Sequence, residues 1–264
     1  MNRVVPGLIM AVAWILLACG PAWLFGLVIL GVAFLALREY FGMTLAEVQA
    51  DHRLLASLCS LAPVFAALDG SPRSVLFGLV LALFALLGLC MVLYGKLEDL
   101  PRFLGLSGLA ALYVGLCGAC LVLLAHAPHK SLWLIVLVAV TAGSDTGAYY
   151  AGRRFGTRKL FPVLSPKKTW EGLWGGLAGG VAAALLIHTL MRGPLGFFTL
   201  IPGAIALVLV GVAGDLAESM LKRACGVKDS GTLLAGHGGV LDRVDSLLLA
   251  APAMYAFLAM QGLL

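Results

Sequence analysis

The feature that most constrains this chain is a series of apolar runs, each about 16–23 residues long, that recurs from the first residues to the last. A helix of that length crosses the hydrocarbon core of a bilayer. Only 12% of the 264 residues are charged and 61% are hydrophobic, whereas a soluble domain carries about 25% charged residues. This composition excludes an ordinary water-soluble enzyme and predicts an integral membrane protein.

The runs predict an all-α fold, a polytopic bundle of about nine transmembrane helices. The short alternating segments typical of a transmembrane β-barrel do not appear in the sequence. Only Gly20 and Pro21 separate the first two runs, so a tight or re-entrant hairpin is an alternative for that pair. The expected spans are Val4–Cys19, Ala22–Leu37, Leu54–Leu68, Ser74–Tyr94, Phe103–Ala125, Ser131–Tyr150, Gly172–Met191, Leu200–Glu218 and Ser246–Leu263.

Lysine and arginine residues predict the orientation, because they gather on the cytoplasmic side of membrane proteins. If the loop Arg153–Lys168 is cytoplasmic, alternate crossings put 15 of the 18 Lys and Arg residues on that side. The amino terminus is then cytoplasmic. The net charge of +5 suits anionic headgroups or a nucleotide there, and it is not evidence for nucleic acid.

We expect one domain over residues 1–264, with an apolar helical part (1–130) and a part that carries polar motifs on the cytoplasmic face (131–264). The protein is expected to be a multi-pass protein of the cell membrane, the inner membrane if the cell has two. Leu16–Cys19 resembles a lipoprotein cleavage box. Whether the first span is retained or cleaved at Cys19 therefore stays open.

The densest polar segment, Ser219–Asp245, is flanked by apolar runs. Ionisable side chains beside a membrane span are costly unless they are paired, hydrated or used, so this segment predicts a functional site. Its charged residues and its histidine are Lys222, Arg223, Lys228, Asp229, His237, Asp242, Arg243 and Asp245.

Several carboxylates in and before this segment are spaced for one helix face. Asp215, Glu218, Ser219 and Lys222 follow i, i+3, i+4 and i+7 spacing, so they share a face if the helix continues to Lys222. Asp242 and Asp245, three apart, would point the same way if a helix begins near Asp242. Such a cluster suits Mg²⁺ and a phosphate chain, because Mg²⁺ uses a few carboxylates together with phosphate oxygens.

The segment Gly236–Gly239 encloses His237 between glycines. Glycine lets backbone N–H groups approach a phosphate closely, and His237 would donate a hydrogen bond to a phosphate oxygen or to the leaving group. The alternative is a structural or solvated histidine.

A second polar region, Gly143–Gly172, follows the sixth run. Asp145 lies among small residues at the end of that run, where an aspartate needs a partner or an ion. The segment Ser165–Gly172 combines Ser, two Lys, Thr and Glu, and predicts a second phosphate-binding site. A third stretch, Arg38–Arg53, is expected to be a short interfacial helix.

The spacing of the first polar segment resembles the signature of the phosphatidate cytidylyltransferase (CDP-diacylglycerol synthase) family. Ala235 departs from it, because the family has Pro or Gly there. Gly143–Tyr149, Ser165–Gly172 and Gly214–Ser219 are also similar to family segments. The signature matches at Ser219, Leu221, Lys222, Arg223, Lys228, Asp229, Gly231, Leu234, His237, Gly238, Gly239, Val240, Asp242, Arg243, Val244 and Asp245.

The resemblance implies that CTP and phosphatidate react to give CDP-diacylglycerol and pyrophosphate on the cytoplasmic side, with Mg²⁺ as cofactor. A second metal or a monovalent cation, and a homodimer, are left open, and no nucleic-acid partner is expected. The implied metal ligands are Asp215, Asp242 and Asp245, with Asp145 as a fourth. The implied catalytic residues are Lys222, Arg223, Lys228, Asp229, His237 and Arg243. The implied substrate and phosphate contacts are Ser165, Lys167, Lys168, Thr169, Ser219, Gly238 and Gly239.

Two other activities are alternatives. A CTP-dependent polyprenol or lipid kinase needs the same reactants but transfers the γ-phosphoryl group. A cation-coupled transporter would place Asp145 and Asp215 at span centres, whereas the sequence places them near span ends. The CDP-alcohol phosphotransferases carry a D-G-x-x-A-R motif that this sequence lacks.

Overall fold

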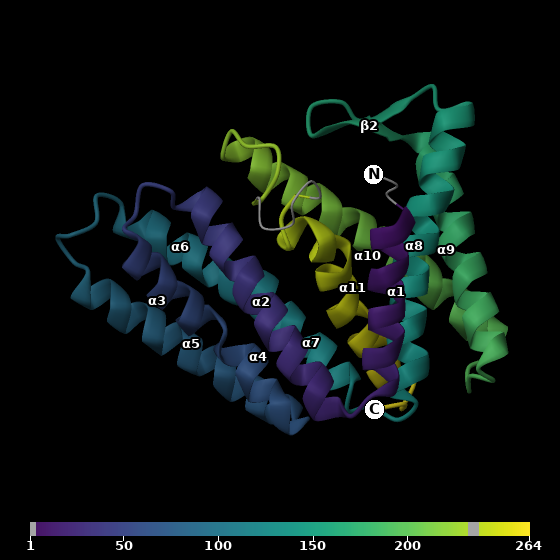
Figure 1. Cartoon of the computed structure of the whole chain (residues 1–264), viewed down its shortest axis with the longest axis horizontal. Coiled ribbons are helices and arrows are strands. Elements are labelled where there is room, and N and C mark those ends of the chain that lie inside the picture. Colours follow the sequence, from purple (N-terminus) through teal and green to yellow (C-terminus); the bar gives the residue numbers. More distant parts are fainter. Residues whose placement is uncertain (1–3, 232–237) are drawn as a thin grey trace. The chain divides into compact units, whose positions relative to one another are not determined.

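A computed structural model gives the structure of residues 4–231 and 238–264, and it is mostly helical (Figure 1). Apolar runs form helices because a backbone in lipid has to satisfy its own hydrogen bonds. The helices are α1 (Val4–Cys19), α2 (Ala22–Thr44), α3 (Ala50–Ser60), α4 (Ala62–Ala66), η1 (Ala67–Asp69), α5 (Pro72–Val92), α6 (Leu100–Ala110), η2 (Ala111–Leu116), α7 (Cys117–Leu124), α8 (Lys130–Phe155), α9 (Trp170–Leu190), α10 (Phe197–Ala224) and α11 (Leu241–Met260).

Within the described residues, seven helices are long and apolar enough to cross a membrane. The expectation of several membrane passes is confirmed, whereas the count of nine is not. The seven are Ala22–Thr44, Pro72–Val92, Leu100–Leu124, Lys130–Phe155, Trp170–Leu190, Phe197–Ala224 and Leu241–Met260.

Two predicted spans are not among these seven helices, each for a different reason. Helix α1 has the predicted bounds, but it is only 16 residues long. The predicted span Leu54–Leu68 is not one helix: α3 ends at Ser60 and α4 begins at Ala62. Pro63 has no backbone N–H to continue the hydrogen-bond ladder, so the helix breaks beside it.

The stretch Arg38–Arg53 is not a separate interfacial helix. Helix α2 covers the first part of this stretch and ends at Thr44, and α3 begins at Ala50 and covers the last part. The polar residues Arg38 and Glu39 therefore belong to the end of a long apolar helix.

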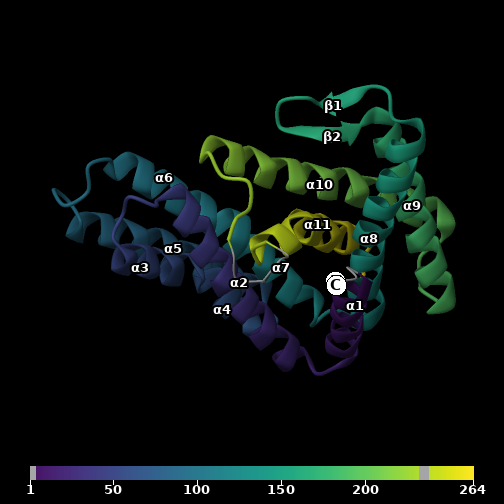
Figure 2. The same cartoon turned by 45° about the horizontal axis from the view of Figure 1, so that its top comes forward.

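A short β-hairpin, which the sequence did not predict, accompanies the helices. Strands β1 (Lys159–Phe161) and β2 (Ser165–Thr169) pair antiparallel between α8 and α9, as Figure 2 shows. The Trp170 N–H donates to the Arg158 carbonyl at 3.0 Å and closes the base of the hairpin. The Glu171 carboxylate also accepts from the Thr157 hydroxyl at 2.5 Å, so polar contacts at the helix ends fold this segment.

The described residues form two compact units. Unit 1 comprises Met1–Leu27, Leu124–Leu209 and Ala253–Leu264, and unit 2 comprises Val28–Leu123 and Val210–Pro252. In unit 1, α8 and α9 approach so closely that a Cβ at Gly143 would lie 2.8 Å from the Gly179 carbonyl oxygen, and one at Gly175 would lie 2.7 Å from that of Gly147. Small residues at four-residue spacing are the usual means of packing membrane helices.

Unit 2 packs around aromatic side chains of α2 and α6. Tyr40, Phe41 and Phe103 are buried, and the Tyr40 hydroxyl donates to the Leu106 carbonyl at 3.1 Å. In the same unit, a Cβ at Gly214 of α10 would lie 2.8 Å from the Asp245 carbonyl oxygen of α11. This close approach puts the carboxylates of the two helices beside each other.

Candidate functional site

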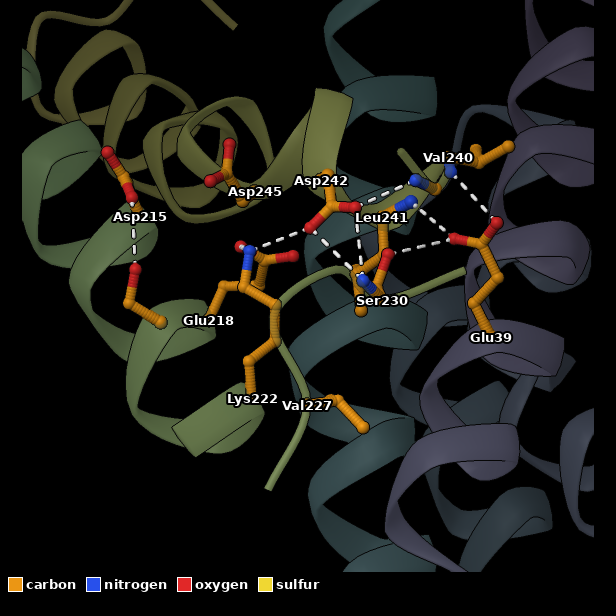
Figure 3. A network of polar contacts seen from close by, with 12 residues as sticks. Glu39, Asp215, Glu218, Lys222, Val227, Ser230, Val240, Leu241, Asp242 and Asp245 are labelled. Atoms are coloured by element: carbon orange, nitrogen blue, oxygen red, sulfur yellow. Dashed lines mark hydrogen bonds and ion pairs between the residues drawn. The ribbon is translucent and has the colours of Figure 1, made fainter. Parts of the chain in front are cut away.

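The site in unit 2 is built from the end of α10 and the beginning of α11 (Figure 3). Helix α10 continues to Ala224, so Asp215, Glu218, Ser219 and Lys222 share one face, as their spacing predicts. The Ser219 hydroxyl donates to Asp215 Oδ1 at 3.5 Å. Helix α11 begins at Leu241, which puts Asp242 and Asp245 in its first two turns.

Lys222 links the two helices. Its amino group lies 2.5 Å from Glu218 Oε2 and 2.7 Å from Asp242 Oδ1. The side chains of Lys222, Glu218 and Asp242 are only 14%, 1% and 9% exposed. A buried charge is tolerated when it is paired and hydrogen-bonded, so the lysine allows two carboxylates to remain in this apolar setting.

Asp242 also holds the chain that precedes its own helix. Its Oδ2 accepts hydrogen bonds from the Ser230 N–H at 3.1 Å and from the Gly239 N–H at 2.7 Å. Gly238 has φ of 80°, a left-handed conformation that glycine adopts without strain. A Cβ there would lie 2.8 Å from Asp242 Oδ2. Asp242 thus joins the residues on both sides of positions 232–237.

Glu39, on α2, completes this network and was missed by the sequence analysis. Its Oε1 accepts from the Val240 N–H at 2.9 Å, and its Oε2 accepts from the Leu241 N–H at 2.9 Å and from the Ser230 hydroxyl at 3.1 Å. The only signal in the sequence was a glutamate after a long apolar run. Nothing local linked it to a segment about 200 residues further on.

The residues fit a divalent cation by their donor chemistry. Asp215, Glu218, Asp242 and Asp245 offer the hard carboxylate oxygens that Mg²⁺ prefers. Among the described residues, the buried Glu218 Oε1 has no hydrogen-bond partner, and a buried oxygen of this kind normally has one. In the arrangement seen, Lys222 occupies the position between Glu218 and Asp242. No three His, Cys, Asp or Glu side chains within the described residues are gathered closely enough to hold a metal.

Four other predicted residues of the first polar segment are exposed, unlike the largely buried Lys222 network. They are Arg223, Lys228, Asp229 and Arg243. Arg223 donates to the Val227 carbonyl at 3.4 Å. His237 lies outside the described residues.

Cys225 follows α10 directly. Burial raises the pKa of the Cys225 thiol above its ordinary value.

The predicted residues of the second polar region lie in unit 1. Asp145 is exposed on α8, and Ser165, Lys167 and Lys168 lie on β2. The buried Thr169 hydroxyl accepts from the Gly172 N–H at 3.1 Å. This is the contact of a helix N-cap, so the position of Thr169 is explained by the start of α9.

The sequence model described as the Cytidylyltransferase family matches residues 1–261. A protein named phosphatidate cytidylyltransferase 5, chloroplastic, from Arabidopsis thaliana is 32% identical over 285 residues, covering 97% of this chain and 70% of that protein.

Two bacterial relatives match over shorter regions. The phosphatidate cytidylyltransferase of Haemophilus influenzae is 46% identical over 135 residues, covering 48% of this chain and 46% of that protein. The protein of the same name from Bacillus subtilis is 38% identical over 157 residues, covering 59% of this chain and 58% of the relative. The chain thus spans about half the length of these bacterial relatives.

Proposed function

Because the chain belongs to the cytidylyltransferase family, we propose that it transfers the cytidylyl group of CTP to phosphatidate. The products are CDP-diacylglycerol and pyrophosphate. The observation that carries this proposal is the Lys222 amino group, held between Glu218 and Asp242 where two membrane-spanning helices meet. The exposed basic residues Arg223 and Arg243 directly follow Lys222 and Asp242 in the sequence. A site with exposed basic residues at the end of membrane-spanning helices suits a reaction between a nucleotide and a lipid.

The reaction forms one P–O bond and breaks another. A phosphate oxygen of phosphatidate attacks the α-phosphorus of CTP, and the bond between the α-phosphorus and the bridging oxygen breaks. Both electrons of that bond leave with pyrophosphate, which takes its proton from water. A phosphate monoester has a second pKa of about 6, so the nucleophile is already dianionic at neutral pH and needs no strong base.

The residues of the site would therefore neutralise charge and align the reactants. The exposed Arg223, Lys228 and Arg243 would contact the phosphates of CTP. Lys222, with both neighbouring carboxylates as partners, would orient Asp242. Lys167 and Lys168 on β2 are proposed as further phosphate contacts, on the resemblance of their segment to the family.

We also propose that Mg²⁺ is the cofactor, held by Asp215, Asp242 and Asp245. Glu218 supports this, because its buried Oε1 lacks a hydrogen-bond partner among the described residues. When bound, Mg²⁺ would neutralise charge on the phosphates and on the departing pyrophosphate.

The site is proposed to face the cytoplasm, where CTP is available, with the amino terminus on the same side. Thiol-directed labelling of single-cysteine variants, by a reagent that does not cross membranes, would test this orientation. Light scattering of the detergent-solubilised protein would separately test whether two copies of the chain form a homodimer.

The decisive experiment supplies purified protein with Mg²⁺, phosphatidate in detergent micelles, and CTP labelled at either the α- or the γ-phosphate. We expect lipid-phase label only from α-labelled CTP, and only with phosphatidate and Mg²⁺ present. Lipid label only from γ-labelled CTP would mean a kinase. If folded protein transfers no label from either form of CTP, both the cytidylyltransferase and the kinase are contradicted, and a transporter is favoured.

A further inference from the structure

The backbone amides at the start of α11 and just before it are held by two carboxylates from different parts of the chain. Asp242 accepts from Gly239, and Glu39 accepts from Val240 and Leu241. The first N–H groups of a helix have no partner within it. Glu39 therefore satisfies two of these donors from another helix, α2, across about 200 residues of sequence.

The surrounding residues leave little other space for the Glu39 carboxylate. A Cβ at Gly231 would lie 2.6 Å from Glu39 Oε1, and one at Gly239 would lie closer still to Oε2. Ser230, which also donates to Oε2, is only 6% exposed. Two glycines and a buried hydroxyl thus enclose the Glu39 carboxylate, and a larger residue at either glycine would displace it.

A carboxylate suits this position for two reasons. Its two oxygens accept from three donors, and its negative charge lies at the amino-terminal, positive end of the α11 dipole. An amide side chain keeps one oxygen but turns an NH₂ group toward N–H donors. A change from Glu39 to Gln therefore removes the interaction while keeping nearly the same volume.

Glu39 acts on the same turn that carries Asp242. It bonds Ser230 through the hydroxyl, while Asp242 bonds the Ser230 N–H. The two carboxylates thus hold Ser230 on one side and the start of α11 on the other. If Glu39 is removed, the N–H groups of Val240 and Leu241 lose this partner, and the Ser230 hydroxyl loses its acceptor.

We propose that Glu39 is a positioning residue for cytidylyl transfer: its carboxylate holds the first turn of α11 and thereby aims Asp242 at the nucleotide site. This rests on the proposed function above. Glu39 itself lies outside every motif that carries the family resemblance, since those motifs begin at Gly143. Its partners Ser230, Val240 and Leu241 lie within the first polar segment.

The test compares Glu39→Gln with Glu47→Gln. Glu47 is an exposed glutamate just beyond α2, whose partner is Arg102. Two readouts are taken in detergent with the full chain: the KM for CTP and for phosphatidate, and hydrogen exchange of the Val240 and Leu241 amides. For Glu39→Gln we expect the KM for CTP to rise about tenfold, with the KM for phosphatidate nearly unchanged, and both amides to exchange about tenfold faster. Glu47→Gln should change neither.

A purely structural role would lower the amount of active protein and leave the KM for CTP as it was, and that result would overturn the proposal. Unchanged amide exchange would also overturn it. If the wild-type protein transfers no cytidylyl group, the proposed function fails and this role of Glu39 in it fails too. The exchange measurement then reports separately on whether Glu39 holds the turn.

If Glu39→Gln does not fold, Ser230→Ala serves as the second variant. It removes one donor to Glu39 and leaves the Ser230 N–H that bonds Asp242. We expect a smaller change of the same kind, about two- to threefold in the KM for CTP. No change in this variant would overturn the proposal.

Discussion

The amino group of Lys222 lies 2.7 Å from the Asp242 carboxylate, and the two residues are 20 positions apart. The same amino group lies 2.5 Å from Glu218, one helical turn before it. A lysine between two buried carboxyl groups thus holds α10 to α11.

Replacing Lys222 by methionine should lower both stability and activity. Removing one partner of a buried ion pair costs about 3–5 kcal/mol, because the other charge remains unpaired. We expect a lower unfolding temperature in detergent and no detectable cytidylyl transfer. The double variant Lys222→Met, Glu218→Gln should recover part of the unfolding temperature but no activity. Full stability of the single variant would contradict the pairing.

Replacing Asp245 by asparagine should abolish turnover while expression and membrane insertion stay normal. Asparagine keeps the shape of the side chain but lacks the charge that a Mg²⁺ ligand supplies. The labelled-CTP assay measures turnover, and Glu98→Gln, at an exposed position, is the matched charge control. Near-normal activity of Asp245→Asn would refute the role as metal ligand.

Replacing Gly147 by alanine should loosen the contact between α8 and α9. The added Cβ would collide with the Gly175 backbone, and overpacking of this kind costs about 1–3 kcal/mol. Thermal unfolding in detergent measures the effect. Gly88→Ala is the control, since no heavy atom lies within 4 Å of a Cβ placed there. Equal unfolding temperatures for the two variants would contradict the close packing.

Replacing Thr169 by alanine separates two roles of that residue. As the N-cap of α9, its loss should cost about 1 kcal/mol of stability, and Thr169→Ser should restore most of it. If Thr169 acts only as a cap, the KM for CTP stays unchanged in both variants. A raised KM in Thr169→Ala, without a loss of stability, would instead indicate the phosphate contact that the sequence predicts.

The local features of the chain were predictable because they depend on residues close in sequence. The apolar runs predict membrane helices, and the spacing of Asp215, Glu218 and Lys222 predicts their shared face on α10. The beginning of α11 at Leu241 was only a condition of the prediction, since the apolar run itself begins at Ser246. Pro63 is a local signal of the break between α3 and α4, and the prediction of one span over Leu54–Leu68 did not use it.

The tertiary structure alone decided which distant residues meet. The hydrogen bonds of Glu39 to Val240 and Leu241, and the close approach of Gly147 to Gly175, depend on how helices pack. Neither has a signal in helical periodicity, because that periodicity describes the face of one helix and not its partner. The sequence by itself thus determined the membrane helices and the polar residues at their ends. The packing of those helices decided that a glutamate of α2 holds the turn that carries Asp242.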